Sequence, residues 1–402
     1  MAQAIVILLT ALIAKHLGGD AKAQWIAAVC VAISPVSLSA NALFQYVSFD
    51  FLWWVLVCYF MARLIESDDP RWWLGIGAAI GLGVLTKYTI AFFVAGLVAG
   101  VLATDLRRHL HSRWLWIGAA ISVAVALPNL IWQATHGFVT LEFLRFIHAR
   151  DVRIGRTKDF FLDQILDSAN PFTLPVWIVG VITAVRVKRL RIFAWMWFVP
   201  MALFIIAQGR GYYSAPLYSM LFAIGAVTSA NAALFILFAL GLVAVPFNVP
   251  LAPPTSRLFR VASNVNHDFA EEFGWPEMTG EVVRIWSALP PDERAHAAIL
   301  CANYGEAGAI DRYGPEHGLP PAISGINSFW ARGYGNPPPQ TVIVLGHSRS
   351  WIEQHFADSR VAGRIPNPYN LANEESERPD IWICRGLKEP WPEFWQKQRS
   401  FG

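Results

Sequence analysis

Two ionisable side chains, Asp50 and Lys87, stand alone in long apolar stretches of the sequence. Asp50 is the only Asp, Glu, Lys or Arg within residues 23–62, and Lys87 is the only one within residues 72–104. An ionised group inside a membrane costs several kcal/mol unless it faces a polar cavity or a partner. The sequence therefore predicts a functional site built on one carboxylate and one ammonium, provided that both line the same cavity.

Each of these residues also has a purely structural interpretation. Asp50 stands at the start of an expected helix, where a carboxylate can cap the backbone N–H groups and meet the positive end of the helix dipole. Lys87 ends a helix, and a lysine there can extend to the membrane interface. The functional alternatives are a carboxylate that binds a sugar hydroxyl or a cation or takes a proton, and an ammonium that neutralises a phosphate. Both interpretations stay open at this point.

A third polar feature is the segment 209–216, Gly-Arg-Gly-Tyr-Tyr-Ser-Ala-Pro. Arginine binds phosphate through two parallel hydrogen bonds, and glycine lets the backbone approach a ligand closely. Tyr212 and Tyr213 present aromatic faces that can stack on a sugar ring, although tyrosine is also a common anchor at the membrane interface. We expect Lys87 and Arg210 to hold one phosphate group together.

Other chemistries lack their motifs in this sequence. It contains no Gly-x-x-x-x-Gly-Lys-Ser/Thr loop for nucleotide hydrolysis, no Cys/His cluster with zinc spacing and no Gly-x-Ser-x-Gly nucleophile elbow. The identity of any bound metal is therefore unknown from the sequence.

The composition predicts a membrane protein with a soluble part. The chain has 402 residues, of which 55% are hydrophobic and only 15% charged, whereas soluble domains carry roughly a quarter charged residues. Residues 1–250 are apolar with short polar breaks, and residues 251–402 are rich in proline and charge. Since one span needs about 20 residues, we expect about ten spans or near-spans, at 1–16, 24–41, 48–64, 72–87, 88–104, 114–134, 172–187, 191–207, 214–229 and 230–249.

The short loops predict the orientation. Lys and Arg concentrate in the loops at 15–22, 63–71, 107–113 and 186–191, and such loops face the cytoplasm. Asp50, Lys87, Arg210, the loop 135–171 and the C-terminal part then lie on the outer side. The loop 135–171 carries apolar residues at helical spacing among charges, a pattern typical of helices at the membrane surface or of a linker packed on the bundle.

Residues 251–402 predict a small α/β domain. Short apolar runs at 297–305, 341–346 and 380–386 are typical of buried strands, and they alternate with expected helices near 268–286, 306–313 and 348–357. Cys301 and Cys384 lie in two of these runs and could form a disulfide if the domain is periplasmic and the two strands are neighbours.

The order of several motifs resembles the bacterial membrane glycosyltransferases related to the protein O-mannosyltransferases and the aminoarabinose lipid A transferases. The resemblance covers nearly the whole chain. The motifs are SFD at 48–50, GLGVLTKYT at 81–89, PNLIWQATHG at 128–137 with LEFL at 141–144, the segment from GYY at 211–213 to Tyr218, NYGEA at 303–307 and SGINSFW at 324–330.

The resemblance implies a polytopic helical fold, often called GT-C, that takes a sugar from a polyprenyl-phosphate donor on the outer face. Lys87 would contact the donor phosphate and Asp50 would lie in the active cavity. Arg210 would border this pocket, and the substrate cavity would include Tyr88, Tyr212, Tyr213 and Glu142. The principal acidic residue of the family lies in the first outer loop, upstream of the matching region here, so an N-terminally truncated member is expected.

Together these observations predict a glycosyltransferase of the bacterial inner membrane. A multi-pass chain would move sugar to a lipid, glycan or protein acceptor on the periplasmic side, with no nucleic acid partner. Asp50 would be the candidate base by position, with a supporting role by resemblance, and a divalent cation could assist. The alternatives are a lipid or solute transporter or flippase, which also uses membrane charges, and a non-catalytic membrane scaffold.

Overall fold

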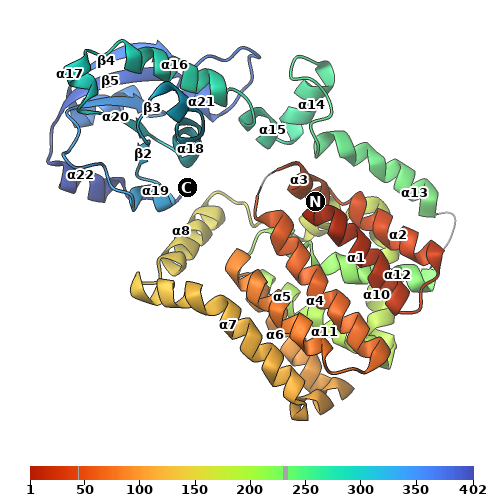
Figure 1. The fold of residues 1–402 in the computed structure, drawn as a ribbon. Helices are drawn as coiled ribbons and strands as arrows, with labels where there is room; N and C mark the ends of the chain where they lie inside the picture. The colour runs from red at the N-terminus through yellow and green to blue at the C-terminus, as the bar shows by residue number, and fades with distance from the viewer. Residues whose placement is uncertain (44, 230–233) are drawn as a thin grey trace. The chain divides into compact units, whose positions relative to one another are not determined.

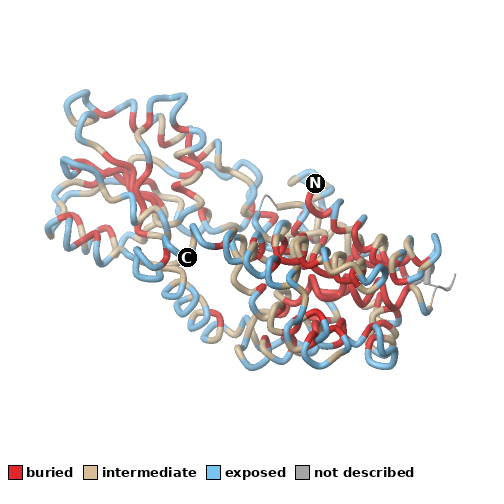
Figure 2. The backbone as a smooth tube through the Cα atoms, turned by 60° about the horizontal axis from the view of Figure 1, so that its bottom comes forward, coloured by how far each residue is buried: buried red, intermediate tan, exposed pale blue. Residues whose placement is uncertain are grey.

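The computed structural model describes residues 1–43, 45–229 and 234–402 of the chain. It divides into two compact units, Met1–Leu251 and Ala252–Gly402 (Figure 1). In the first unit the described residues form helices and loops only, and the second unit contains a sheet. Buried backbone segments are found in both units, as Figure 2 shows, so each has its own apolar core.

The helices of the first unit follow one another closely along the chain. They are α1 (Ala2–His16), α2 (Ala21–Ala32), α3 (Pro35–Ala42), α4 (Val47–Ser67), α5 (Trp72–Thr86), α6 (Ile90–Ala103), α7 (Arg113–Thr135), α8 (Val139–Arg153), α9 (Phe160–Asp163), α10 (Leu174–Arg186), α11 (Arg191–Ile206), α12 (Leu217–Ser229) and α13 (Leu234–Gly241). Short helical turns join several of them: η1 (Asp105–His111), the π-helix η2 (Gln164–Ala169), η3 (Pro171–Thr173), η4 (Lys188–Leu190), η5 (Gly211–Ser214) and η6 (Leu242–Phe247).

Several of these helices are long and apolar enough to cross a membrane. Among the described residues, the three long ones are Val47–Ser67, Arg113–Thr135 and Lys188–Ile206, and three bent pairs raise the number to six if each pair is one span. The pairs bend by 64° between α2 and α3, 98° between α6 and η1, and 82° after the π-helix. Each expected apolar segment overlaps a described helix, and the last, 230–249, begins outside the described residues. The number of ten spans stays a prediction.

Close contacts between backbones hold the helix bundle together. A Cβ atom on Gly77 of α5 would lie 1.9 Å from the carbonyl oxygen of Gly118 on α7, and a Cβ on Gly225 of α12 would lie 1.9 Å from the carbonyl oxygen of Val176 on α10. Small residues allow such an approach, and it increases the van der Waals contact between membrane helices. Only glycine at these positions permits the short distance between the helices of the α5–α7 pair and of the α10–α12 pair.

The loop expected at 135–171 contains two different structures. The helix α8 is exposed along most of its length, with the buried exception of Asp151. After it, α9 and the π-helix pack against the turn η5 at 211–214. The second half of this segment thus matches the interpretation of a linker packed on the bundle.

The second unit is an α/β structure around a five-stranded sheet of order β2-β1-β3-β5-β4. Strands β1 (Ala297–Cys301), β2 (Ile323–Ser324) and β3 (Thr341–Leu345) are parallel, whereas β5 (Asp380–Leu387) runs antiparallel to both β3 and β4 (Phe356–Arg364). The helices are α14 (Arg257–Val265), α15 (Asp268–Glu271), α16 (Trp275–Ser287), α17 (Pro291–Arg294), α18 (Tyr304–Tyr313), η7 (Pro315–His317), α19 (Asn327–Trp330), α20 (Arg349–His355), α21 (Glu374–Glu377) and α22 (Trp391–Gln398).

Cys301 and Cys384 do not form the disulfide considered from the sequence. Both are buried free thiols. Strand β3 lies between their strands, and the two side chains belong to different apolar clusters of the domain. The two strands are therefore not neighbours, as the bond would require.

The glycine contact between α5 and α7 predicts opposite effects of one substitution at two sites. Gly77→Ala places a methyl group against a backbone oxygen, and such overpacking costs about 1–3 kcal/mol. Gly280→Ala, in α16, meets no atom within 4 Å and should stabilise its helix by up to about 1 kcal/mol, since alanine is the better helix former. Thermal unfolding of both variants in detergent measures the difference. A Gly77→Ala protein that unfolds at or above the wild-type temperature would contradict the contact.

Candidate functional site

Lys87 lies where the chain leaves α5 and turns into α6. Its backbone is extended and its N–H donates to the carbonyl of Gly83 at 2.8 Å. The neighbouring Thr86 hydroxyl accepts a hydrogen bond of 2.8 Å from the Trp53 indole on α4. The backbone at Lys87 is thus held in place by its own helix α5 and by one other helix, α4.

Three tyrosine rings surround the Lys87 ammonium. Its Nζ lies 3.8 Å from the ring centre of Tyr213, 5.1 Å from that of Tyr212 and 5.9 Å from that of Tyr46. Each distance is within reach of a cation–π interaction. The side chain is therefore held among aromatic rings, an arrangement that the simple interface-anchor interpretation does not predict.

Asp50 does not cap its helix. The N-cap position of α4 is Tyr46, and Asp50 stands in the first turn with 4% of its surface exposed. Its Oδ1 accepts a hydrogen bond of 3.0 Å from the indole of Trp54, whose ring stacks on Phe93 at 4.7 Å. The capping interpretation is wrong, because Asp50 lies inside the first turn of α4, after the N-cap position of Tyr46.

Asp50 and Lys87 share one electrostatic environment. The carboxylate attracts the ammonium, and the Arg210 guanidinium repels it. The structure thus brings together the three charged residues singled out from the sequence, which come from α4, from the α5–α6 junction and from the segment before η5.

Arg210 has a partner that sequence reasoning missed. Its Nε donates to Asp151 Oδ2 at 2.5 Å and its Nη2 donates to Asp151 Oδ1 at 2.8 Å. Arg150 adds a longer contact of 3.4 Å. Burial opposes the ionisation of Asp151, yet the Arg210 guanidinium holds the pKa of this carboxyl below its usual range. This fork-like pairing orients the arginine and occupies two of its donor nitrogens.

The π-helix η2 holds the turn η5 and the preceding Arg210 in place. Gln164 donates to the carbonyl of Gly211 at 3.1 Å, and its amide oxygen accepts from Ser214 at 2.6 Å and from Tyr218 at 3.1 Å. A Cβ on Gly211 would lie 2.2 Å from Cβ of Asp163. The glycine is therefore required by packing, and π-helical turns of this kind occur frequently at functional sites.

The two remaining expected cavity residues lie in different surroundings. Tyr88 follows Lys87 directly, is half-buried and donates a hydrogen bond of 2.5 Å to the side-chain oxygen of Asn129 on α7. Glu142 is exposed in the first turn of α8. Tyr88 is thus adjacent to the lysine in the chain, and the cavity role of Glu142 stays a prediction.

The described side chains offer charge and aromatic faces but no evident metal cage. In the residues that the structure describes, no group of three or more His, Cys, Asp or Glu side chains is arranged to hold an ion. The arrangement can bind an anion between two cations and present aromatic rings beside it.

Comparisons with known proteins match part of this chain. Residues 1–132 match the family model of the dolichyl-phosphate-mannose-protein mannosyltransferases. Lipid A galacturonosyltransferase RgtD from Rhizobium johnstonii is 30% identical over 169 residues, which are 41% of this chain and 34% of that protein. The chain thus spans about a third of the length of this curated relative.

Among solved structures, ArnT from Cupriavidus metallidurans, crystallised with undecaprenyl phosphate, aligns with a TM-score of 0.47 and 14% identity, over 95% of this chain and 82% of that one. The family match is the more specific of these similarities, because it is a match of sequence pattern and includes both Asp50 and Lys87. Residues 1–132 of the chain are thus similar to the dolichyl-phosphate-mannose-protein mannosyltransferases.

Proposed function

We propose that this chain is a membrane glycosyltransferase that moves a sugar from a polyprenyl-phosphate donor to a lipid, glycan or protein acceptor. The observation that carries the proposal is the Lys87 ammonium, held among three tyrosine rings beside Asp50. The family description names a dolichyl-phosphate sugar, which is a donor of this chemical class. A cation beside aromatic faces suits the phosphate and the sugar ring of such a donor.

The proposed role of Lys87 is to stabilise the leaving phosphate. In the transfer, an acceptor oxygen attacks the anomeric carbon while the bond from this carbon to the phosphate oxygen breaks. Negative charge then grows on the phosphate, and a fixed cation stabilises it most strongly where water is excluded. Arg210 supports this role from the other side, with the donors that Asp151 leaves unoccupied.

Asp50 is proposed as a positioning residue for Lys87. The sequence made it the candidate base, by position, for the proton of the acceptor hydroxyl. Its burial and its bond to Trp54 favour a different task, because one oxygen is already occupied and the carboxylate attracts the lysine. In this role it keeps the ammonium charged and oriented in apolar surroundings.

The site is proposed to face the outside of a bacterial inner membrane. The support is the distribution of Lys and Arg in the short loops, which places Lys87 and Arg210 on the outer side. The chain would then be a multi-pass protein whose C-terminal unit is periplasmic or extracellular.

Removal of the Lys87 ammonium should abolish transfer. Loss of one group that stabilises developing charge typically costs about 100- to 1,000-fold in kcat, so Lys87→Ala should lower turnover by at least that range. The measurement is transfer of radiolabelled sugar from a polyprenyl-phosphate donor in membranes that contain the protein. Lys158→Ala changes an exposed lysine and is the control. Wild-type turnover of the Lys87→Ala protein would refute the proposed role.

Asp50→Asn separates a positioning carboxylate from a base. A general base contributes about 100- to 10,000-fold, whereas a positioning residue is expected here to cost about 10-fold in kcat, with an unchanged or lower KM for the donor because a negative charge near the phosphate is removed. Trp54→Phe removes the hydrogen bond and should cause a smaller loss of the same kind. A loss of kcat as large as that of Lys87→Ala, without a change in KM, would instead make Asp50 the base.

Asp151→Asn tests the pairing with Arg210. Breaking a buried ion pair from one side costs up to about 3–5 kcal/mol, since the remaining charge is left without a partner. We expect a lower unfolding temperature, and a partial recovery in the double variant Asp151→Asn, Arg210→Gln, in which transfer stays low. Arg150→Gln removes only the 3.4 Å contact and should change little. Equal unfolding temperatures of Asp151→Asn and the wild type would show that the pair is not important for stability.

A further inference from the structure

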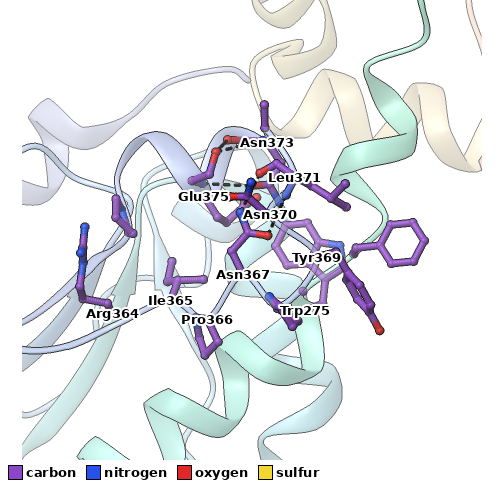
Figure 3. A pocket seen from close by; sticks show the side chains of 16 residues that line it. Trp275, Arg364, Ile365, Pro366, Asn367, Tyr369, Asn370, Leu371, Asn373 and Glu375 are labelled. Atoms are coloured by element: carbon purple, nitrogen blue, oxygen red, sulfur yellow. Dashed lines mark hydrogen bonds between the residues drawn. The ribbon is translucent and has the colours of Figure 1, made fainter. Parts of the chain in front are cut away.

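The second unit contains a pocket of about 630 Å³ (Figure 3). One wall is the segment 364–379, which follows β4 and includes α21, and the other is Phe273, Gly274 and Trp275 at the start of α16. Its volume lies in the range of about 300–1,000 Å³ that is typical of small-molecule sites. All of its lining residues belong to the C-terminal unit, so it shares no residue with the site around Lys87.

Glu375 lines this pocket with a carboxylate that lacks a partner. Only 6% of the residue is exposed, and neither carboxylate oxygen has a hydrogen-bond partner among the described residues. The side chain of Asn303 and the backbone N–H of Glu375 itself lie close enough to favour the ionised form, but neither is a hydrogen-bond partner of the carboxylate. A buried carboxylate without a donor costs free energy that a protein normally avoids, so this group is available to a ligand.

The groups around Glu375 are also acidic. Glu374 precedes it, and Glu271 accepts a hydrogen bond of 3.1 Å from the backbone N–H of Glu374. Burial and these neighbours raise the pKa of Glu271 to about 7, the pKa of Glu306 to about 7, and that of Glu375 above its usual value. The field in this region therefore favours a positive charge.

Neither of the nearby arginines, Arg364 and Arg378, forms an ion pair with Glu375. Arg364 lines the pocket but pairs with Asp380 at 3.0 Å, and Arg378 donates to the carbonyl of Gly346 at 3.2 Å. No other cation among the described residues pairs with Glu375 either. A cation from outside the chain would compensate the negative charge of Glu375.

The walls of the pocket are aromatic and held in place. The indole N–H of Trp275 donates to the carbonyl of Glu271 at 2.9 Å, and Phe273 packs edge-on against Tyr369 at 5.6 Å. Aromatic faces attract organic cations, more strongly where water is excluded. Asn367 and Asn373 serve the loop, since their side chains bond to the backbone of Leu371 and of Ser376.

We propose that this pocket binds an organic ammonium group, with the carboxylate of Glu375 as its counter-ion and Trp275 and Tyr369 as its aromatic walls. A neutral hydroxyl could donate a hydrogen bond but would leave the charge of Glu375 uncompensated. An ammonium supplies the donor and the charge together. An amino sugar and a lysine side chain share this chemistry.

Binding is measured on the full chain in detergent, by saturation-transfer NMR and calorimetry, with two probes. Glucosamine represents an amino sugar and Nα-acetyl-lysine methylamide represents a polypeptide side chain. Each has a matched neutral probe, N-acetylglucosamine for the first and Nα,Nε-diacetyl-lysine methylamide for the second. We expect at least one amine to bind and its acetylated form to bind at least tenfold more weakly, and the stronger amine identifies the source. Equal binding of the charged and neutral forms, or binding of neither amine, would overturn the proposal.

The variant Glu375→Gln should reduce amine binding on the order of 30-fold or more, because the ammonium loses its buried counter-ion. It should also unfold at the same or a higher temperature, since an unpartnered charge is removed. Glu377→Gln makes the same change on an exposed residue of the same helix and should leave binding unchanged. Tyr369→Ala removes one of the proposed aromatic walls and is a second test of amine binding.

The pH dependence has a defined sign. The pKa values of Glu375 and of its neighbours Glu271 and Glu306 are raised, so these groups take up protons at mildly acidic pH. The ε-ammonium of the lysine probe, with a pKa of about 10.4, stays charged over this range, so the pH series uses this probe. Amine binding should therefore strengthen as the pH rises from 5 to 8. Binding that weakens over this range, or that persists unchanged in Glu375→Gln, would contradict the role of the carboxylate.

Discussion

The desolvation of charge inside an apolar helix bundle is the constraint on which the site in the first unit depends. A lysine and a carboxylate placed in such surroundings are stable only when other groups replace the water that they lose. The bundle supplies these groups from several segments: tyrosine rings to the ammonium, an indole to the carboxylate and a second carboxylate to the arginine. The helices that carry them must therefore meet at one place, and much of the local architecture serves this meeting.

The sequence allowed the charged members of this site to be predicted, but not all of their partners. Asp50 and Lys87 were evident because each is a single charge in an apolar stretch. Asp151 was not, because it lies among other charges in an amphipathic segment, where burial of one carboxylate leaves no sequence signal. Its alternation with Arg150 and Arg153 resembles an ordinary solvated face, and only the fold shows that it is buried.

The same reasoning explains the strands. The runs at 297–305, 341–346 and 380–386 correspond to β1, β3 and β5, because central strands are apolar on both faces. Strand β4 was missed, since its sequence FADSRVAGR is mostly exposed at the edge of the sheet and lacks an apolar run. The strand β2 was also missed, because it has only two residues. The start of the helix that carries Asp50 was predicted to within one residue, but the carboxylate lies inside the first turn and does not occupy the cap position.

The two units treat buried acids in different ways. In the first, Asp151 is fully paired by a guanidinium, which gives rigidity. In the second, Glu375 and its acidic neighbours are left without such a cation, and a pocket opens beside them. Stability of the fold favours a paired buried acid such as Asp151. The unpaired Glu375 therefore lowers the free energy of unfolding at the place where the pocket lies.

The backbone contact between Gly77 and Gly118 has a mechanical consequence. Two helices that touch without intervening side chains cannot slide or separate without losing this contact, and Tyr88 further ties the end of α5 to Asn129 on α7. Lys87 is thus attached to a rigid pair of helices, α5 and α7. The turn with Tyr212 and Tyr213 is anchored as well, through the hydrogen bonds of Gln164 to Gly211 and Ser214, so the ammonium is held between two fixed parts of the bundle.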